Sequence, residues 1–577
     1  MRHGTWSIWS LLTILTVLGS VGAARIEAQT PPPAIFFTDL TSGPVSGGES
    51  VSGYAGAYVT IYGNYFGTTQ GTSTVTLGGA SCLRVVSWGT TWLWYQKIVV
   101  QLGSSCASGN FVVTTTSGGS NGAAFSVNAG SIYCVSTSGN DSNTGKFPST
   151  CWATPAHAVS TMSAGGIAYV ENGVTQTGAT QYSAVVNIMG NPGGTAANPI
   201  ALVAYPGATV TIGALGAGLN YAIRVPQVGD SPAYYTIAGL TIRGDEALEI
   251  YSASYMRFIA NDLSCDAATG FGCAHIDSST YIYMYGNNLH DVGVDCASNS
   301  GNPTGSPCKF HGYYYTTNTN HVWHGWNITN TNPSGTLPAT GYGVQFYSTG
   351  GSDQYDLHVH DNLFENIAGG ALNFSTVNAD AGTVEAYNNV FNHVGTGPDP
   401  SGTSEAYYGV GTAASSTHTN PVLVYNNSMY DVGSRGNVTN SNGCINATIA
   451  TEIVNNVCQS TGSSEQYLTS NSSAVDCGNF SGSHNDWFGN GSTLCATQVT
   501  SSLNVNPLYT STTAGSVNLL PQAASPLIGA GSTSLASVYD MSGMIRPSPL
   551  SIGAYELSSG TAAQLPNPPT NLQVTVQ

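Results

Sequence analysis

The stretch that decides the fold reads HVHDNLFENIAG at residues 358–369. Its pattern, an apolar strand followed by two polar residues and one apolar residue, returns as EAYNNVFNHVG at 385–395 and VYNNSMYDVG at 424–433. Repetition at a few dozen residues is typical of a solenoid, in which each coil covers the apolar side of the next. Related copies lie at 257–265, 283–293, 324–330, 453–462 and, less closely, 483–491.

The second polar residue of each copy serves as an anchor for comparing coils. Gaps between anchors run 26, 39, 35, 27, 38 and 29 residues, which indicates a constant coil with loops of different length. Asn at a bend bonds its own backbone and the Asn one coil away, so we expect a ladder of amides. Leucine-rich horseshoes and propellers are the alternatives, and their signatures are missing. The anchors are Asp262, Asn288, Asn327, Asn362, Asn389, Asn427 and Asn456.

Composition supports an all-β class. Charged residues make up only 7% of the 577 residues, whereas Gly occurs 71 times and Tyr 32 times. Such a composition favours strands and turns over helices. The net charge of −18 disfavours nucleic acid as a partner, because phosphate binding needs clustered Lys and Arg. Polyanionic sugars meet the same objection unless a bound cation intervenes.

The chain begins with the features of an export signal. Arg2 and His3 precede an apolar run over 6–21, and small residues follow, so residues 1–28 are predicted to be a signal peptide. A membrane anchor is the alternative, but the run is shorter than the about 20 residues that span a bilayer. We expect a protein that is secreted or at the cell surface and keeps no membrane span after signal cleavage.

Twelve cysteines fall in near pairs, which in an exported chain predicts six loop-closing disulfides, although the sequence does not determine their connectivity. No Cys-x-x-Cys is present, so a zinc site of that kind is not indicated. The near pairs are Cys82/Cys106, Cys134/Cys151, Cys265/Cys273, Cys296/Cys308, Cys444/Cys458 and Cys477/Cys495.

Residues 34–129, after a proline-rich linker at 29–33, contain short alternating runs typical of a small β-sandwich. The runs VTIYGNYFGTT at 59–69, STVTLGGASC at 73–82 and GNFVVTTTSGGSNGAAFSV at 109–127 resemble the IPT/TIG family of Ig-like domains. That resemblance implies a spacer or binding module rather than a catalyst.

Residues 130–557 resemble the right-handed parallel β-helix proteins of the pectate-lyase-like superfamily, which include many polysaccharide lyases. Besides the repeat, the stretch at 133–159 looks like the first coil with its capping helix, and 504–556 looks like the final coils. Residues 558–577 are interpreted as a linker or tail, disordered or the start of a further domain.

Side chains alternate along a strand, so positions at equal distance from the anchor form columns. Positions five and three before the anchor, such as Tyr283 and Tyr285, are predicted to face the core, and positions four and two to face solvent. The outward positions place Trp323, His358 and Glu385 in one column and His360, Tyr387 and Tyr425 in a second.

A second strand in each coil gives another outward column of Tyr314, Gln345 and Asn373, with Lys309 and His311 just before it. Aromatic rings beside His, Gln, Asn and Glu are typical of sugar binding, although ordinary strand residues look the same. The substrate-binding candidates are Trp323, Gln345, His360, Asn373, Tyr387 and Tyr425.

A uronate lyase needs a base for the C5 proton and a cation for the carboxylate. Lys309 or His311 is the candidate base and Tyr314 the candidate acid, with His358 and Glu385 as further catalytic candidates. No neighbouring Arg is evident. A glycosidase needs two carboxylates about 5–10 Å apart, and no pair stands out among Asp353, Asp356, Asp361, Glu365 and Glu385.

Three function classes therefore stay open: a polysaccharide-active enzyme, a non-catalytic protein that binds carbohydrate, and a structural surface protein. The expected partner is a polysaccharide or cell-surface glycan, and a lyase is favoured over a hydrolase if the protein is an enzyme. No cofactor is certain. The loop GNDSNTG at 139–145 leaves Ca²⁺ open, although it reads more readily as a turn, and a metal site of His358, His360 and Glu385 is a weaker alternative.

Overall fold

The computed structural model describes residues 30–557 except for short internal gaps, and residues 32–557 form one compact unit. The predicted signal peptide and tail, together with Lys309, Cys296 and Cys308, lie outside the described residues. The gaps are 180–182, 191–192, 217–220, 227–230, 267–270, 293–309, 332–340, 349–352, 397–406, 435–441, 463–464, 471–475, 493–494 and 514.

The alternating runs near the N-terminus form two small, mostly antiparallel sheets that share one apolar core, which includes Val59, Ile98, Phe111 and Phe125. One sheet has the order β1–β3–β6–β5, and the other β2–β9–β7–β4 with β8 beside β7. The strands are β1 (Ala34–Thr38), β2 (Ser42–Gly43), β3 (Tyr58–Asn64), β4 (Thr74–Leu77), β5 (Leu83–Trp92), β6 (Tyr95–Leu102), β7 (Gly109–Thr115), β8 (Gly118–Gly119) and β9 (Ala123–Val127).

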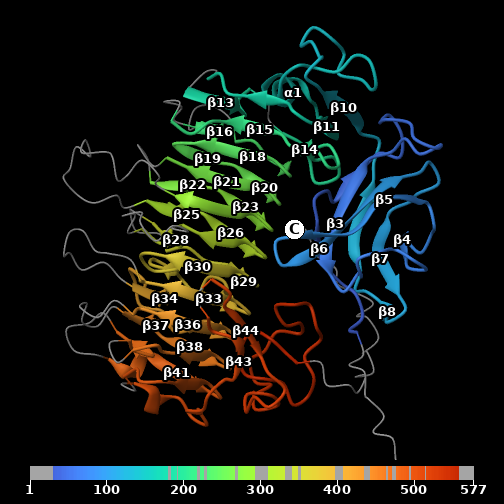
Figure 1. The fold of residues 1–577 in the computed structure, drawn as a ribbon. Coiled ribbons are helices and arrows are strands. Elements are labelled where there is room, and N and C mark those ends of the chain that lie inside the picture. The colour runs from blue at the N-terminus through green and yellow to red at the C-terminus, as the bar shows by residue number, and fades with distance from the viewer. Residues whose placement is uncertain are drawn as a thin grey trace, which may run out of the picture. The chain divides into compact units, whose positions relative to one another are not determined.

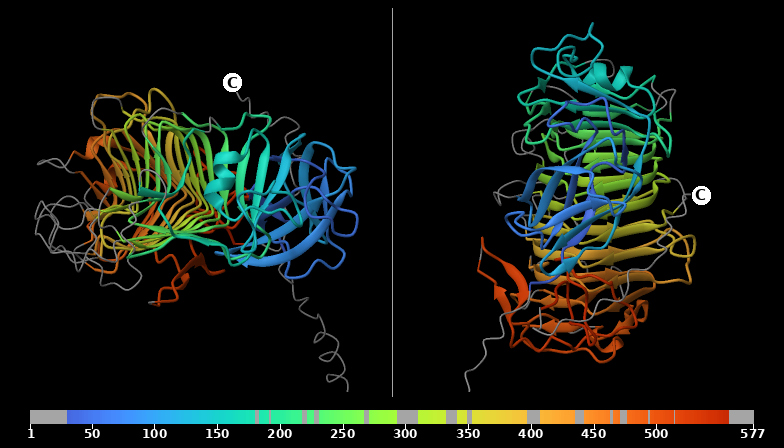
Figure 2. Two further views of the ribbon diagram at one scale, coloured as in Figure 1. Left: turned by 90° about the horizontal axis from the view of Figure 1, so that it is seen from above. Right: turned by 90° about the vertical axis from the view of Figure 1, so that its right-hand side faces the viewer.

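From Ser131 onward the chain winds into a right-handed parallel β-helix, which confirms the predicted fold class (Figures 1 and 2). Each strand pairs in parallel with its counterpart one coil later, giving three long sheets that we call sheets 1, 2 and 3. Apolar side chains fill the interior rung upon rung. Aromatic rings form part of this interior: Tyr315, Phe346 and Phe374 are buried and stack with centroids 4.7 and 5.4 Å apart.

Each complete coil contributes one strand to each sheet in turn, whereas the first and last coils lack some of these strands. Sheet 1 contains β10 (Ser131–Val135), β11 (Gly166–Val170), β14 (Ile200–Ala204), β17 (Tyr235–Ala238), β20 (Ser254–Ile259), β23 (Thr280–Tyr285), β26 (Asn320–Gly325), β29 (Leu357–His360), β32 (Val384–Tyr387), β35 (Val422–Tyr425), β38 (Thr451–Val454) and β41 (Phe480–Ser483). Sheet 2 contains β12 (Thr175–Gln176), β15 (Thr211–Gly213), β18 (Thr241–Gly244), β21 (Asp262–Cys265), β24 (Asn288–Val292), β27 (Ile328–Asn330), β30 (Leu363–Ile367), β33 (Val390–Val394), β36 (Ser428–Val432), β39 (Val457–Gln459) and β42 (Asp486–Phe488). Sheet 3 contains β13 (Ala184–Asn187), β16 (Tyr221–Val225), β19 (Glu246–Tyr251), β22 (Gly272–Asp277), β25 (His311–Thr316), β28 (Val344–Tyr347), β31 (Leu372–Phe374), β34 (Tyr407–Thr412), β37 (Asn442–Ala447) and β40 (Leu468–Thr469).

The first coil carries α1 (Pro155–Thr161), which packs on β13. Thr154 caps this helix by accepting a hydrogen bond from the His157 N–H at 3.2 Å. Asp141, in the loop weighed as a calcium site, accepts bonds from the N–H groups of Ala153 and Thr154 at 2.8 and 3.0 Å, as a turn residue would. Among the described residues, no helix is long and apolar enough to cross a membrane.

The bend between sheets 1 and 2 carries the expected amide ladder. Asn287, fully buried, shows the pattern: its N–H and Nδ2 both donate to Oδ1 of Asn327, at 2.8 and 3.1 Å, and Nδ2 also donates to the Phe258 carbonyl at 2.9 Å. Each amide therefore satisfies backbone groups of its own coil and its neighbours. The ladder runs through Asn261, Asn287, Asn327, Asn362, Asn389, Asn427, Asn456 and Asn485.

Two of the predicted anchors were wrong by one residue. The ladder uses Asn261 and Asn287, not Asp262 and Asn288. The residue before each ladder Asn has a positive φ, and this residue is Ala260 in one coil and Gly286 in the next. Because non-polar residues fill that left-handed position in these two coils, counting polar letters placed the anchor too late.

The shift of one residue reverses which side chains face the core in that coil. Tyr283 and Tyr285, predicted to face inward, lie on the outward face, whereas Met284 is fully buried. In the later coils the predicted inward residues, such as Val322 and Val359, are buried as expected.

Five of the six expected disulfides join described cysteines, and each is local in sequence. They close loops of 8 to 24 residues, so they secure single coils or, for Cys82–Cys106, the sandwich. The other four are Cys134–Cys151, Cys265–Cys273, Cys444–Cys458 and Cys477–Cys495.

Two segments cover part of the β-helix surface. The N-terminal sandwich packs on sheet 1, where Trp92 Nε1 donates to the Gly286 carbonyl at 2.8 Å and Arg257 donates to the Thr38 carbonyl at 2.7 Å. The C-terminal segment, with strands β43 (Tyr509–Ser511) and β44 (Asn518–Pro521), packs on sheet 2 through residues such as Leu527 and Ile552. Two 3₁₀ turns precede it at the end of the β-helix, η4 (Cys477–Asn479) before β41 and η5 (Ala496–Gln498) after β42. In the described part of the chain, the apolar clusters of both segments fall on sheets 1 and 2.

Candidate functional site

A polar column runs along the outward face of sheet 3. The predicted alignment of Tyr314, Gln345 and Asn373 is confirmed, since the three residues pair directly from coil to coil. The column extends in the N-terminal direction through three residues that the sequence comparison missed, and all three are titratable. In order, it consists of Arg224, Glu249, His275, Tyr314, Gln345 and Asn373. Figure 1 shows the strands of the first five, β16, β19, β22, β25 and β28, as one stack.

The three missed residues lie in strands that precede the second-strand copies we compared. A weak signal was present: GCAHID at 272–277 aligns with HGYYYT at 311–316, which places His275 beside Tyr314. In the structure the two rings stack with centroids 5.5 Å apart and planes 23° apart. Phe271, 60% exposed, lies beside both rings at the solvent boundary.

Two carboxyl groups gather at the charged end of the column. Glu249 forms an ion pair with Arg224, and Glu246 lies on the same strand, almost fully buried. Burial raises the pKa of Glu246 well above its usual range, and the charge of Glu249 adds to the effect. Burial also raises the pKa of Glu249, while Arg224 opposes this shift. The sequence reasoning had found no carboxyl pair because it weighed only later coils.

His275 completes this cluster. Burial lowers the pKa of His275 to about 4, so the imidazole is neutral at neutral pH. One ligand atom from each of Glu246, Glu249 and His275 lies within 4.8 Å of the others, so these three residues could hold a metal ion. The second such group in the described residues, Cys134, Cys151 and Glu171, is excluded because its two sulfurs form a disulfide.

Tyr314 and His311 lie next to this cluster. Burial raises the pKa of Tyr314 to about 12, so its hydroxyl remains a proton donor at neutral pH. The His311 Nδ1 accepts a hydrogen bond from the Tyr342 N–H at 3.0 Å, so in the neutral ring the proton lies on Nε2. The geometry fits an acid at Tyr314 and does not favour His311 as a base. Lys309 lies outside the described residues.

The other predicted column, on sheet 1, is also formed. Trp323 pairs with His358, and His358 with Glu385. His358 lies between two carboxylates: Nδ1 is 2.6 Å from Glu385 Oε1, and Nε2 is 2.9 Å from Asp356 Oδ1. With both nitrogens bonded, His358 has no lone pair for a metal ion or for a proton from a substrate.

Stacking along the β-helix covers the ring faces of this column. Trp323 lies between Tyr283 and His358, with centroids 5.0 and 5.3 Å away and planes within 12°. A sugar stacks on a ring face, and here the faces are taken by neighbouring rings. The second predicted column behaves alike: Tyr387 lies between His360 and Tyr425, 5.1 and 4.9 Å away. If the rings of these two columns bind substrate as predicted, they can contact it only through their edges.

Replacing His358 by Gln should remove a pH-dependent part of the stability. Burial opposes the charged ring, but the hydrogen bonds that the ring donates to Asp356 and Glu385 outweigh burial and raise the pKa of His358 to about 9. Since this exceeds the unfolded value of about 6.5, the stabilisation is complete below pH 6.5 and is lost as pH rises through 9. Between these limits the free energy of unfolding should fall by up to about 3 kcal/mol in the parent but not in the variant.

The measurement is denaturant unfolding at a series of pH values, with His157→Gln on α1 as a control that should follow the parent. The pKa of Asp356 is lowered, chiefly by its bond to His358, so its contribution disappears only as pH falls below about 4. Parallel curves for parent and His358→Gln from pH 6.5 to 9 would contradict the assignment.

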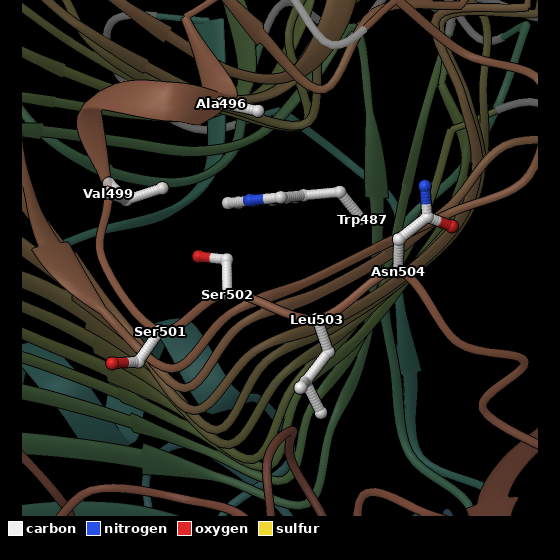
Figure 3. A pocket seen from close by; sticks show the side chains of 7 residues that line it. All are labelled: Trp487, Ala496, Val499, Ser501, Ser502, Leu503 and Asn504. Atoms are coloured by element: carbon white, nitrogen blue, oxygen red, sulfur yellow. The ribbon is translucent and has the colours of Figure 1, made fainter.

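A cavity of about 330 Å³ lies at the C-terminal end of the β-helix interior, beside Trp487 on the last strand of sheet 2 (Figure 3). Its lining holds apolar side chains and neutral polar groups but no titratable one, so it offers little for catalysis. The remaining lining residues are Ala496, Val499, Ser501, Ser502, Leu503 and Asn504.

The strands define this chain as a right-handed parallel β-helix protein with an N-terminal β-sandwich. No protein-family model and no curated protein matches the sequence. Similar solved structures include pectate lyase Pel9A (TM-score 0.45, 14% identity, 74% of this chain and 96% of that chain). XylC in complex with xylose has a TM-score of 0.42 and 9% identity, over 74% of this chain and 98% of that chain. An alginate lyase from Paenibacillus sp. str. FPU-7 has a TM-score of 0.35 and 13% identity, over 64% of this chain and 96% of that chain. At these identities the likeness says nothing of activity.

Proposed function

We propose that this protein binds a polysaccharide along the sheet 3 column and cleaves it by β-elimination. The observation that carries the proposal is the unbroken run of polar side chains from Arg224 to Asn373. Successive coils lie about 4.8 Å apart. An extended glycan lying along the β-helix axis would therefore meet one new side chain of the column per coil. Sheets 1 and 2 are partly covered by the two flanking segments. In the sheet 3 column, Arg224 and Tyr314 are partly exposed, whereas the other members are buried, so a glycan would contact this face first at the exposed side chains.

The chemistry of the column suits elimination from a uronate. This reaction needs a cation or strong donors at the carboxylate and an acid for the leaving oxygen. Gln345, one coil from Tyr314, supplies a neutral amide donor at the carboxylate, and the protonated Tyr314 supplies the acid. Lys309, two residues before β25, remains our predicted base.

We further propose that the chain is exported through residues 1–28 and that the sandwich belongs to the IPT/TIG class and acts as a non-catalytic brace. Five disulfides support an oxidising compartment. The packing of the sandwich on sheet 1 supports the role as a brace.

The test is a screen of the purified protein against neutral and acidic polysaccharides, followed in two channels. Ultraviolet absorbance detects the unsaturated ends that elimination creates, and a reducing-end assay detects any cleavage. We expect both signals on a uronate-containing polymer. Reducing ends without absorbance would replace elimination by hydrolysis, and binding without either signal would favour the non-catalytic alternative.

A further inference from the structure

We propose that Glu246, Glu249 and His275 form a binding site for one divalent transition-metal ion, with Zn²⁺ as the representative ion. The three side chains lie on neighbouring strands of sheet 3, because Glu249 pairs with His275 and Glu246 is three residues before Glu249. Their ligand atoms lie within 4.8 Å of one another, and all three residues are buried. The inference does not depend on the proposed polysaccharide cleavage.

The hydrogen bonds around His275 determine which ring nitrogen carries the proton and which one has a lone pair available for a metal ion. Thr316 donates its only hydroxyl proton to Asp277 Oδ2 at 2.7 Å. Thr316 Oγ1 also lies 3.1 Å from His275 Nε2, and because its proton is used it can only accept there, from an Nε2–H group. The neutral ring therefore carries its proton on Nε2 and presents a lone pair at Nδ1. A carboxylate that orients a histidine ligand in this way, here through Thr316, is a common feature of metal sites.

The lone pair of His275 Nδ1 points toward another acceptor. Glu246 Oε2 lies 3.9 Å away, is buried, and has no hydrogen-bond partner among the described residues. The side chain of Glu246 is only 2% exposed, so water does not replace the missing partner freely. A proton shared between the two atoms would require a distance below about 3.2 Å. A cation between them satisfies both atoms at once.

The distances and charges also fit a cation. Zn²⁺ bonds of about 2.0–2.2 Å to nitrogen and oxygen place donor atoms about 3–4 Å apart, close to the observed separation. When both are ionised to bind a cation, Glu246 and Glu249 supply two negative charges, and Asp245 and Asp277 add to the negative field at the cluster. Within the described residues Glu249 forms its ion pair with Arg224, and a carboxylate has lone pairs for both Arg224 and an ion.

The mixed donor set selects the class of ion. Imidazole nitrogen with carboxylate oxygen suits Zn²⁺ and related transition ions, whereas Ca²⁺ and Mg²⁺ prefer oxygen donors throughout. We therefore expect Zn²⁺ to bind and Ca²⁺ not to displace it at equal concentration.

The experiment uses the full chain after chelator treatment, with Zn²⁺ titrated by isothermal calorimetry and bound metal counted by elemental analysis. We expect one tightly bound ion per chain. Glu246→Gln, which keeps the oxygen that accepts the Phe271 N–H at 3.0 Å, and His275→Gln should each weaken binding at least about 100-fold. Thr316→Val, which removes only the orienting bond, should weaken it about 10- to 100-fold.

Glu452→Gln, on sheet 1 beside Leu423, is the matched control and should bind like the parent. Thermal melting without metal shows which variants are folded, and Thr316→Val provides a mild change if the ligand variants do not fold. The proposal is overturned if the folded parent takes up no Zn²⁺, if His275→Gln binds it as tightly as the parent, or if Ca²⁺ displaces it. Since no outcome uses catalysis, failure of the polysaccharide proposal would leave this test unaffected.

Discussion

Replacing Asn287 by Ala should lower the free energy of unfolding by about 4 kcal/mol, whereas Asn288→Ala should cost under about 1 kcal/mol. The two residues are adjacent and chemically identical, but Asn287 is fully buried in the ladder and Asn288 is partly exposed. Truncating Asn287 leaves the N–H of Asn261 and the Phe258 carbonyl without the partners they have in the parent. Each buried polar group that loses its partner costs about 1–3 kcal/mol.

Asn288 makes one side-chain bond, from Nδ2 to Asp262 Oδ2 at 3.0 Å, at a site that water can reach. The comparison is made by denaturant unfolding of both variants, with amide hydrogen exchange to locate the loss. Since stability in a solenoid spreads mainly between neighbouring coils, exchange should rise most around Asn261 and Asn327. Equal destabilisation by both variants would mean that the ladder contributes no more than a surface hydrogen bond.

On the polysaccharide that the screen identifies, Tyr314→Phe should lower kcat by about 10²- to 10⁴-fold, the usual range for losing a general acid. The ring and its stacking on His275 are kept, so KM should change little. The pKa of Tyr314, raised by burial to about 12, keeps the hydroxyl protonated, so this group should not limit the rate until pH approaches that value.

Tyr347→Phe is the matched control, because Tyr347 lies on the next strand of sheet 3 beside Thr316 and outside the column. Its kcat should stay within a few-fold of the parent. Calorimetric binding of the polymer to Tyr314→Phe separates lost chemistry from lost binding. If Tyr314→Phe binds the polymer and cleaves it at the parent rate, the acid must be another group.

The repeat made the β-helix predictable, since an apolar strand followed by a bend Asn recurs often enough to identify coils one at a time. The alignment of Tyr314 with Gln345 and the local disulfides were predictable for the same reason, because each depends on short-range spacing. The errors arose where the repeat weakens. Ala260 and Gly286 replace the polar residue at the left-handed bend. For this reason two anchors were predicted one residue too late, and Tyr283 and Tyr285 were predicted to face the core when they face outward.

By itself, the sequence determined the class of fold, the amide ladder and the existence of outward columns, because these depend on side-chain alternation and on the conformational preference of Asn at a bend. Only the tertiary structure decided which columns are accessible and which groups meet. Packing of the sandwich on sheet 1 and of the C-terminal segment on sheet 2 joins residues hundreds of positions apart. The meeting of Glu246, Glu249 and His275 depends on coil lengths set by irregular loops, and spacing along the chain does not encode such distances.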